Sequence, residues 1–197
     1  NYHEALKVQE TLIRAEPTTT SANFITARSS DGALVGLVRI VERDIRVRSA
    51  VLRCGGLSSI SVHPGWRRRG VNGDMMRAAC EVMTARGMDL TYLHGRRAMD
   101  GYYTRFGYSC MNRYLDLEVL STPAADALTL EPGFPGGTKL AARLYEQTYG
   151  ALSGSVVRTE DIWNFLITRS SSLKGDCSIL QCRSKKRKRP VGYIVLS

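Results

Sequence analysis

A strand, a basic turn and a helix follow one another in residues 57–86, and this stretch constrains the fold more than any other part of the sequence. Leu57–Val62 is a short run with β-branched residues, which predicts a strand. Pro64 follows it and ends it, because proline lacks the N–H group that a strand ladder needs. From Val71 onward, apolar side chains recur at three- and four-residue spacing, which predicts a helix with one apolar face.

The turn between that strand and that helix predicts an anion-binding site. Arg67, Arg68 and Arg69 bring adjacent positive charges to it. Gly70 has no Cβ, so a ligand oxygen can approach the backbone closely. The helix that begins at Val71 exposes unpaired N–H groups and carries a partial positive charge at its start. Together these features favour a doubly charged ligand such as a pyrophosphate.

The context of this turn carries the prediction, because an Arg-x-x-Gly spacing alone is common in a chain so rich in arginine and glycine. Here an apolar strand ends just before the turn and an amphipathic helix begins just after it. The chain has neither GxGxxG nor GxxxxGK[ST], which disfavours a dinucleotide-binding or nucleoside-triphosphate-binding loop.

The motif VxPxxRRRGV at residues 62–71 resembles the acetyl-CoA pyrophosphate signature of the GNAT acetyltransferase superfamily. The usual form is Arg/Gln-x-x-Gly-x-Gly/Ala, and Asn72 departs from it at the last position. The arginine-rich version is similar to the enhanced intracellular survival (Eis) protein acetyltransferases, a subgroup that does not keep the final small residue. The resemblance implies an α/β GNAT fold, with a mixed, mostly antiparallel sheet and a splayed central parallel pair.

The resemblance also implies how acetyl-CoA, the co-substrate of this family, is held. The pantetheine arm would pair with the open backbone edge of the central strand, and the pyrophosphate would lie on the basic turn and the helix N-terminus. The residues implied for cofactor binding are Ile60, Ser61, Val62, Arg67, Arg68, Arg69, Gly70, Val71, Asn72 and Gly73.

A second motif, YxRFGY at residues 103–108, is similar to the fourth-helix region of the same subgroup. The resemblance implies that Tyr103 returns a proton to the leaving thiolate. Tyrosine suits this role because its reference pKa of about 10 exceeds that of a thiol, about 8.5. The alternative is that aromatic residues before a glycine turn are core residues, which we expect of Tyr102 or Tyr108.

The general base is not evident from the sequence. No Asp or Glu lies on the central strand, residues 57–62, where many GNAT enzymes keep one. In the resembling subgroup the base is the terminal carboxylate of the full-length chain, which implies that Ser197 is not that residue. We expect a structural role for His63, whereas His94, at the end of a strand, is a candidate for substrate contact.

The first half of the chain predicts one domain over residues 1–120. We expect a helix over Tyr2–Arg14, packed on the sheet. We expect a short strand over Leu90–His94, parallel to the central strand. Three further antiparallel strands are expected over Asn23–Ala27, Ala33–Val41 and Ile45–Arg53. Gly87 is expected to cap the central helix.

The second half predicts a linker over residues 121–137 and a partial second GNAT-like domain over 138–197. The first unit is completed by an alternating strand, Arg113–Leu120. The order helix, helix, strand, strand that follows is how a GNAT domain opens. The predicted elements are Thr138–Leu152, Glu160–Ile167, Cys177–Cys182 and Val191–Leu196. The subgroup's sterol-carrier-like C-terminal domain is not found, so we expect the chain to be truncated.

Charge and cysteine content narrow the function classes. The net charge is +10, but residues 183–189 (RSKKRKR) carry six of the basic side chains. This cluster is either a targeting or RNA-contacting patch or the solvated loop of a hairpin, and the β-rich flanks favour the loop. The five cysteines are odd in number and lack CxxC spacing, which favours reduced thiols in a cytoplasmic protein. No apolar run approaches the ~20 residues of a membrane span.

The resemblance therefore implies an enzyme that transfers an acetyl group from acetyl-CoA to a primary amine by direct attack. A protein lysine, a polyamine and an aminoglycoside-like amine all remain open as acceptors, as does assembly into a homo-oligomer. The competing interpretation is a non-catalytic GNAT-like module that binds an acyl-CoA or nucleic acid. Clustering of the basic residues in two turns disfavours nucleic acid, for which a basic face with interleaved aromatics is expected.

Overall fold

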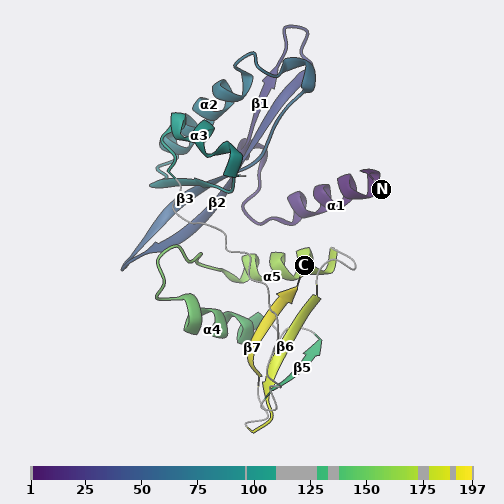
Figure 1. Ribbon diagram of the computed structural model, residues 1–197, viewed down its shortest axis with the longest axis vertical. Helices are drawn as coiled ribbons and strands as arrows, with labels where there is room; N and C mark the ends of the chain where they lie inside the picture. The colour runs from purple at the N-terminus through teal and green to yellow at the C-terminus, as the bar shows by residue number, and fades with distance from the viewer. Residues whose placement is uncertain are drawn as a thin grey trace. The chain divides into compact units, whose positions relative to one another are not determined.

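The computed structural model describes residues 2–95, 97–109, 128–132, 138–172, 178–186 and 190–196. These residues divide into two compact units (Figure 1). The first unit is Thr18–Leu115, and the second unit joins Asn1–Pro17 to Asp116–Ser197. Within the described residues, no helix is long and apolar enough to cross a membrane.

The first unit is built on a four-stranded sheet with the order β1-β2-β3-β4. Strands β1, β2 and β3 are antiparallel, whereas β4 runs parallel to β3. This mixed, mostly antiparallel sheet with one parallel pair confirms the predicted fold class. The strands are β1 (Phe24–Arg28), β2 (Leu34–Val47), β3 (Ala50–Val62) and β4 (Leu90–Leu93).

Strand β4 ends before β3 does, so the last residues of β3 extend beyond the parallel pair. The pairing of the two strands runs from Cys54 opposite Leu90 to Leu57 opposite Leu93, while β3 continues to Val62. Just beyond the last pair the β2–β3 register shifts, and Ser59 takes a left-handed φ of 53°. This β-bulge bends β3 locally. Among the described residues, no strand pairs with β3 on the β4 side over residues 58–62.

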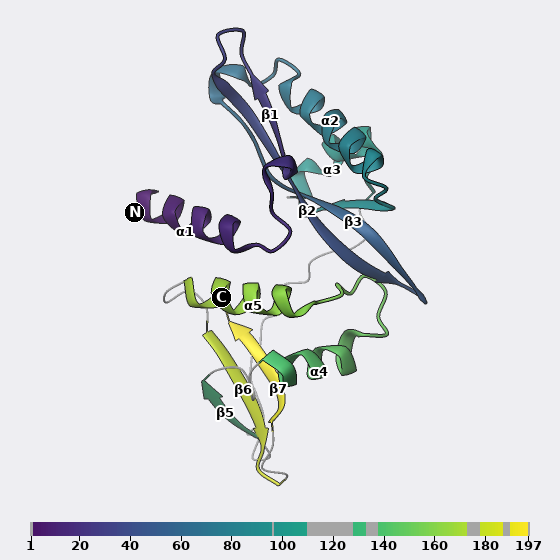
Figure 2. The same ribbon diagram turned by 180° about the vertical axis from the view of Figure 1, so that it is seen from behind.

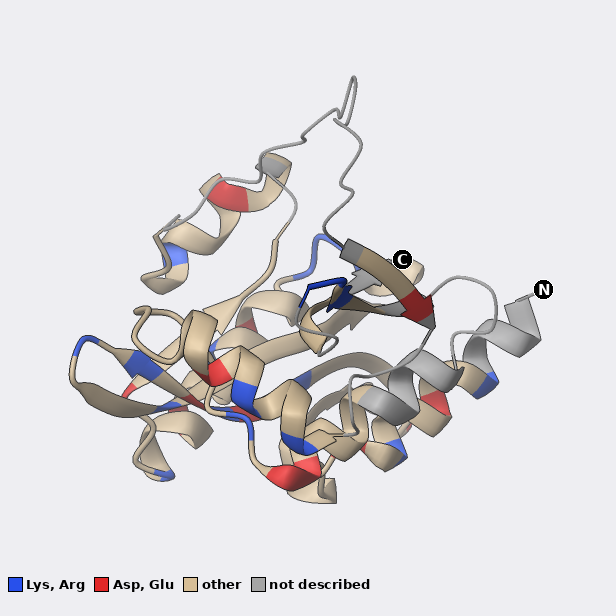
Figure 3. Cartoon of the chain, turned by 90° about the horizontal axis from the view of Figure 1, so that it is seen from below, with Lys and Arg blue, Asp and Glu red and all other residues tan. Residues whose placement is uncertain are grey.

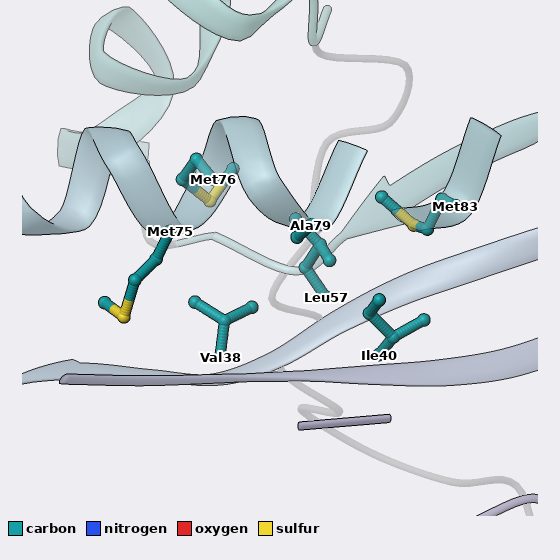
Figure 4. Close-up of a cluster of buried hydrophobic side chains, with 7 residues drawn as sticks. All are labelled: Val38, Ile40, Leu57, Met75, Met76, Ala79 and Met83. Atoms are coloured by element: carbon teal, nitrogen blue, oxygen red, sulfur yellow. The ribbon is translucent and has the colours of Figure 1, made fainter. Parts of the chain in front are cut away.

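Helix α2 (Val71–Ala85) covers one face of this sheet and forms the core with it. Figure 4 shows its side chains facing those of β2 and β3. Gly87, with a φ of 67°, ends the helix as predicted: its N–H donates to the Thr84 carbonyl, and the Met88 N–H donates to that of Met83. The buried cluster consists of Val38, Ile40, Leu57, Met75, Met76, Ala79 and Met83.

The predicted strand Ile45–Arg53 is wrong, because the chain reverses in its middle. Strand β2 continues to Val47, a turn follows, and β3 begins at Ala50. Arg48 makes the turn possible by adopting a left-handed φ of 56°. Apolar and basic residues alternate in the same way before and after the turn, so the sequence pattern did not reveal it.

The second unit contains helices on a three-stranded antiparallel sheet of order β5-β6-β7 (Figure 2). Its buried cluster is Ala141, Tyr145 and Trp163. Thr159 caps α5, since its Oγ1 accepts from the Ile162 N–H at 3.4 Å. The elements are α1 (Tyr2–Ala15), β5 (Leu128–Pro132), α4 (Thr138–Tyr149), α5 (Glu160–Ser172), β6 (Ser178–Ser184) and β7 (Pro190–Leu196).

Helix α1 lies beside α5 in this unit, a neighbour that the sequence did not predict, because an apolar helix face does not specify which apolar surface will cover it. The expected linker, residues 121–137, contains β5, where the Glu131 carboxylate accepts from Gln181 Nε2 at 3.0 Å and Arg183 Nε at 2.7 Å. The strand expected over Arg113–Leu120 lies outside the described residues.

The basic cluster at 183–189 lies at a hairpin, as the loop interpretation predicted. Strands β6 and β7 are antiparallel, with Arg183 opposite Pro190. Lys185 and Lys186 form the described part of the turn, and residues 187–189 lie outside the described part of the chain.

We expect Met76→Ala to lower the free energy of unfolding by about 2–5 kcal/mol, because it leaves a cavity in the core. Met76 is 0% exposed, whereas Met99 is 38% exposed and lies outside that core. Urea denaturation measures the effect, with Met99→Ala as the matched control, for which a change within about 0.5 kcal/mol is expected. Equal losses for the two variants would contradict the packing described here.

Candidate active site

A cavity of about 710 Å³ lies in the first unit beside the end of β3 that extends past β4. Its volume falls within the range of small-molecule sites, roughly 300–1,000 Å³. The end of β3, the basic turn, the first turn of α2 and the segment after β4 all contribute to it. The lining residues are Ile60, Ser61, Val62, Trp66, Arg67, Arg68, Gly70, Val71, Asn72, Gly73, Met99, Tyr102 and Arg105.

The basic turn is held by its own backbone and side chains. Arg67 Nε donates to the Val62 carbonyl oxygen at 3.3 Å, which closes the turn onto the end of β3. Arg68 adopts a left-handed φ of 62°, a strained conformation for a residue with a Cβ. His63 has the structural role expected of it, since its Nδ1 accepts from the Gly65 N–H at 3.3 Å.

The start of α2 is open to an acceptor from outside the helix. Gly70 caps the helix with a φ of 84° and ψ of −14°, and no side chain bonds to the first N–H groups from the cap position. A left-handed cap of this kind suits glycine, which has no Cβ to clash. Asn72 lines the cavity, and its buried Oδ1 has no hydrogen-bond partner among the described residues. The helix therefore offers unused N–H groups beside the arginines.

Almost all of the residues predicted for cofactor binding line this cavity; Arg69 does not. Its guanidinium carbon lies 5.1 Å from the centre of the Trp66 ring, a cation–π contact. Arg69 thus packs on a residue that itself lines the cavity. Trp66 therefore lines the cavity and also holds Arg69.

The charge of the cavity is positive. Arg67, Arg68 and Arg105 line it, and no Asp or Glu is among the lining residues. The nearby carboxylate of Asp74 forms an ion pair with Arg77 at 2.5 Å. The three guanidinium groups and the helix start, which has no side-chain cap, therefore fit a pyrophosphate. The open strand edge fits the amide groups of a coenzyme A ester.

The three tyrosines of the second motif lie in different surroundings. Tyr102 lines the cavity, in α3 (Asp100–Tyr103). The Tyr103 ring packs over Gly95, where a Cβ would lie 3.1 Å from Cε2 of the ring. The two rings meet edge to face with centroids 5.4 Å apart. Burial raises the pKa of Tyr103, so its hydroxyl stays protonated at neutral pH.

Tyr108 has the core position that the sequence allowed for it. Thr91 Oγ1 donates to the Gly55 carbonyl oxygen at 2.9 Å and lies 2.7 Å from the Tyr108 hydroxyl. Because the single proton of Thr91 is used on Gly55, Tyr108 donates to Thr91. Tyr108 therefore ties the end of the second motif to β4 and is not free to serve a substrate.

Four lining residues were not among those predicted for cofactor binding: Trp66, Met99, Tyr102 and Arg105. Arg105 stands within the YxRFGY motif and could have been singled out, but nothing in the sequence marked Met99.

Asp89 directly precedes β4, and its Oδ2 accepts from the Arg53 N–H at 2.8 Å.

Comparison with known proteins assigns the family. The acetyltransferase (GNAT) domain family matches residues 2–111. The chain belongs to that family. No curated protein sequence matches it.

Two solved structures share the fold of this GNAT chain across nearly its whole length. Eis1 from Mycobacterium abscessus is 18% identical with a TM-score of 0.62, covering 99% of this chain and 50% of Eis1. A conserved protein of unknown function from Enterococcus faecalis V583 is 16% identical with a TM-score of 0.64, covering 98% of this chain and 52% of that protein. This chain thus spans about half the length of either structure.

We expect Tyr108→Phe to flatten the alkaline pH dependence of stability. Burial raises the pKa of Tyr108 from 10.0 to about 12. The neutral hydroxyl therefore contributes stability below pH 10 that is lost as the pH rises toward 12. Urea denaturation at several pH values measures the slope, which should be shallower for this variant than for wild type.

The control for this experiment is Tyr149→Phe, since Tyr149 is 47% exposed. It should keep the wild-type slope. An unchanged slope in Tyr108→Phe would contradict the assignment.

Proposed function

We propose that the chain is an acetyl-CoA-dependent N-acetyltransferase that acetylates a primary amine by direct attack. The observation that carries this proposal is the unpaired end of β3 beside a helix start that has no side-chain cap, in a cavity lined by arginines and no carboxylate. One end of the cavity thus suits a phosphate group and the other an extended amide chain. Family membership supports the reaction class.

In this proposal the cofactor is held by the residues that the sequence predicted. Arg67, Arg68 and the N–H groups of Val71–Gly73 bind the pyrophosphate at the start of α2. The backbone edge of Ile60–Val62 pairs with the amides of the pantetheine arm, as one strand pairs with another. Arg69 packs on Trp66 outside the lining of this site.

Acetyl-CoA supplies the acetyl group as an activated thioester. Backbone N–H groups on the edge of β3 stabilise the oxyanion that forms when an uncharged amine attacks. The Tyr103 hydroxyl gives its proton to the sulfur as the C–S bond breaks and the new C–N bond remains. The amine loses a proton to solvent, and Tyr103 takes one up from solvent to return to its neutral form. The raised pKa of Tyr103 keeps that proton in place until it is needed.

The competing function is acyl-CoA binding without transfer. One observation favours it: Tyr103 is not among the residues that line the cavity, whereas its neighbour Tyr102 is. Nucleic-acid binding has less support. Figure 3 shows Lys and Arg spread over several elements, with Asp and Glu on the same elements.

We expect Arg68→Gln to weaken acetyl-CoA binding by about tenfold or more, because a charge-assisted hydrogen bond to phosphate is lost. Arg69→Gln should change affinity by less than about threefold, since Arg69 stacks on Trp66 outside the lining. Isothermal titration calorimetry of acetyl-CoA into each protein measures both. Absence of binding to the wild type would contradict the cofactor proposal.

We expect Tyr103→Phe to lower turnover by roughly 10²–10⁴-fold while leaving acetyl-CoA affinity nearly unchanged, because only a proton donor is removed. Tyr102→Phe is the matched control and should keep turnover within about threefold. Release of the CoA thiol measures turnover, with spermidine, kanamycin and a lysine peptide tested as acceptors and the fastest one used. A larger loss in Tyr102→Phe would transfer the role to Tyr102, and acetyl-CoA binding without thiol release would support the non-catalytic alternative.

A further inference from the structure

We infer that Arg105 binds the 3′-phosphate of the cofactor and makes the site selective for coenzyme A esters over their dephospho forms. The inference rests on the proposed function, because it names a further contact of the same site. Arg105 lies outside the basic turn in the sequence, and only the fold brings it to the cavity.

Arg105 lines the same cavity as the start of α2, although the two are far apart in sequence. It belongs to the short helix η4 (Thr104–Phe106), and it lines the same cavity as Arg67 and Arg68. The neighbouring Phe106 packs on the first turn of α2: a Cβ on Gly73 would lie 3.8 Å from Cζ of its ring. Two segments more than thirty residues apart thus bring guanidinium groups to one cavity.

The charge of Arg105 is not neutralised by the protein. Among the described residues, no carboxylate forms an ion pair or hydrogen bond with it. Arg77, on the same first turns of α2, shows the contrast, because Asp74 pairs with it at 2.5 Å. Arg77 is not among the lining residues.

An aromatic ring positions Arg105 in place of a carboxylate. Its guanidinium carbon lies 5.7 Å from the centre of the Tyr102 ring. Stacking of this kind supports the planar face of the guanidinium and leaves its N–H donors free at the edge. Those donors match the oxygens of a phosphate group, which accept in the same plane.

The number of positive charges favours a third phosphate group. A pyrophosphate diester carries two negative charges, which Arg67, Arg68 and the helix start can satisfy. Arg105 adds a further charge on the opposite segment. A phosphomonoester carries about −1.5 to −2 charges at neutral pH, and coenzyme A has one on its ribose. Arg105 is the residue placed to bind it.

The test compares two ligands on three proteins by calorimetry. Acetyl-CoA and acetyl-3′-dephospho-CoA differ only in the phosphomonoester. The proteins are the wild type, Arg105→Gln and Arg77→Gln, the last a matched control whose charge is already paired. We expect Arg105→Gln to lose about tenfold in affinity for acetyl-CoA but less than about twofold for the dephospho ligand. Arg77→Gln should bind both ligands as the wild type does.

Each other outcome has a definite meaning. Equal loss for both ligands would place Arg105 on the pyrophosphate and overturn the inference, as would unchanged binding of acetyl-CoA. A wild type that binds neither ligand would instead overturn the proposed function. A thermal unfolding midpoint for Arg105→Gln equal to that of the wild type excludes misfolding as the cause of a loss.

Discussion

Strand β3 pairs with β4 only as far as Leu57, and this early end of pairing is the constraint on which the site depends. Because β4 ends there, residues 58–62 keep a backbone edge free of any described strand, and a bulge at Ser59 bends β3 locally. An edge of this kind is an extended row of donors and acceptors that a ligand's amides can meet. Because Arg67 is bonded back to Val62, the open edge also fixes where the basic turn begins.

Helix α2 must lie close to the sheet for its first turn to meet this edge. Glycines at the sheet surface make that approach possible, because a Cβ on Gly36 would lie 2.8 Å from Sδ of Met75 and one on Gly55 would collide with Met83. Methionine suits such contacts, since its unbranched thioether fills irregular gaps. The core therefore sets the position of the helix N-terminus, and through it the position of the unpaired N–H groups.

The arginines around the cavity show that residues of one type serve different purposes. Arg67 closes the turn, Arg69 stacks on Trp66 and Arg105 stacks on Tyr102. None of the lining residues is acidic, so the positive charge of the lining arginines is left for a ligand. Arg68 is held in a left-handed conformation, and strain of this kind is found where a side chain must be aimed at a ligand.

The sequence by itself determined the elements whose signals are local: the strand, basic turn and helix of residues 57–86, the Gly87 cap, the hairpin around the 183–189 cluster and, by motif, the fold class. It did not determine the turn at Arg48, because alternating residues read the same on either side of it. Only the tertiary structure decided that α1 packs beside α5, that Arg69 stacks on Trp66, and that Arg105 lines the cavity. Those outcomes depend on which distant surfaces meet, and one-dimensional periodicity carries no information about that.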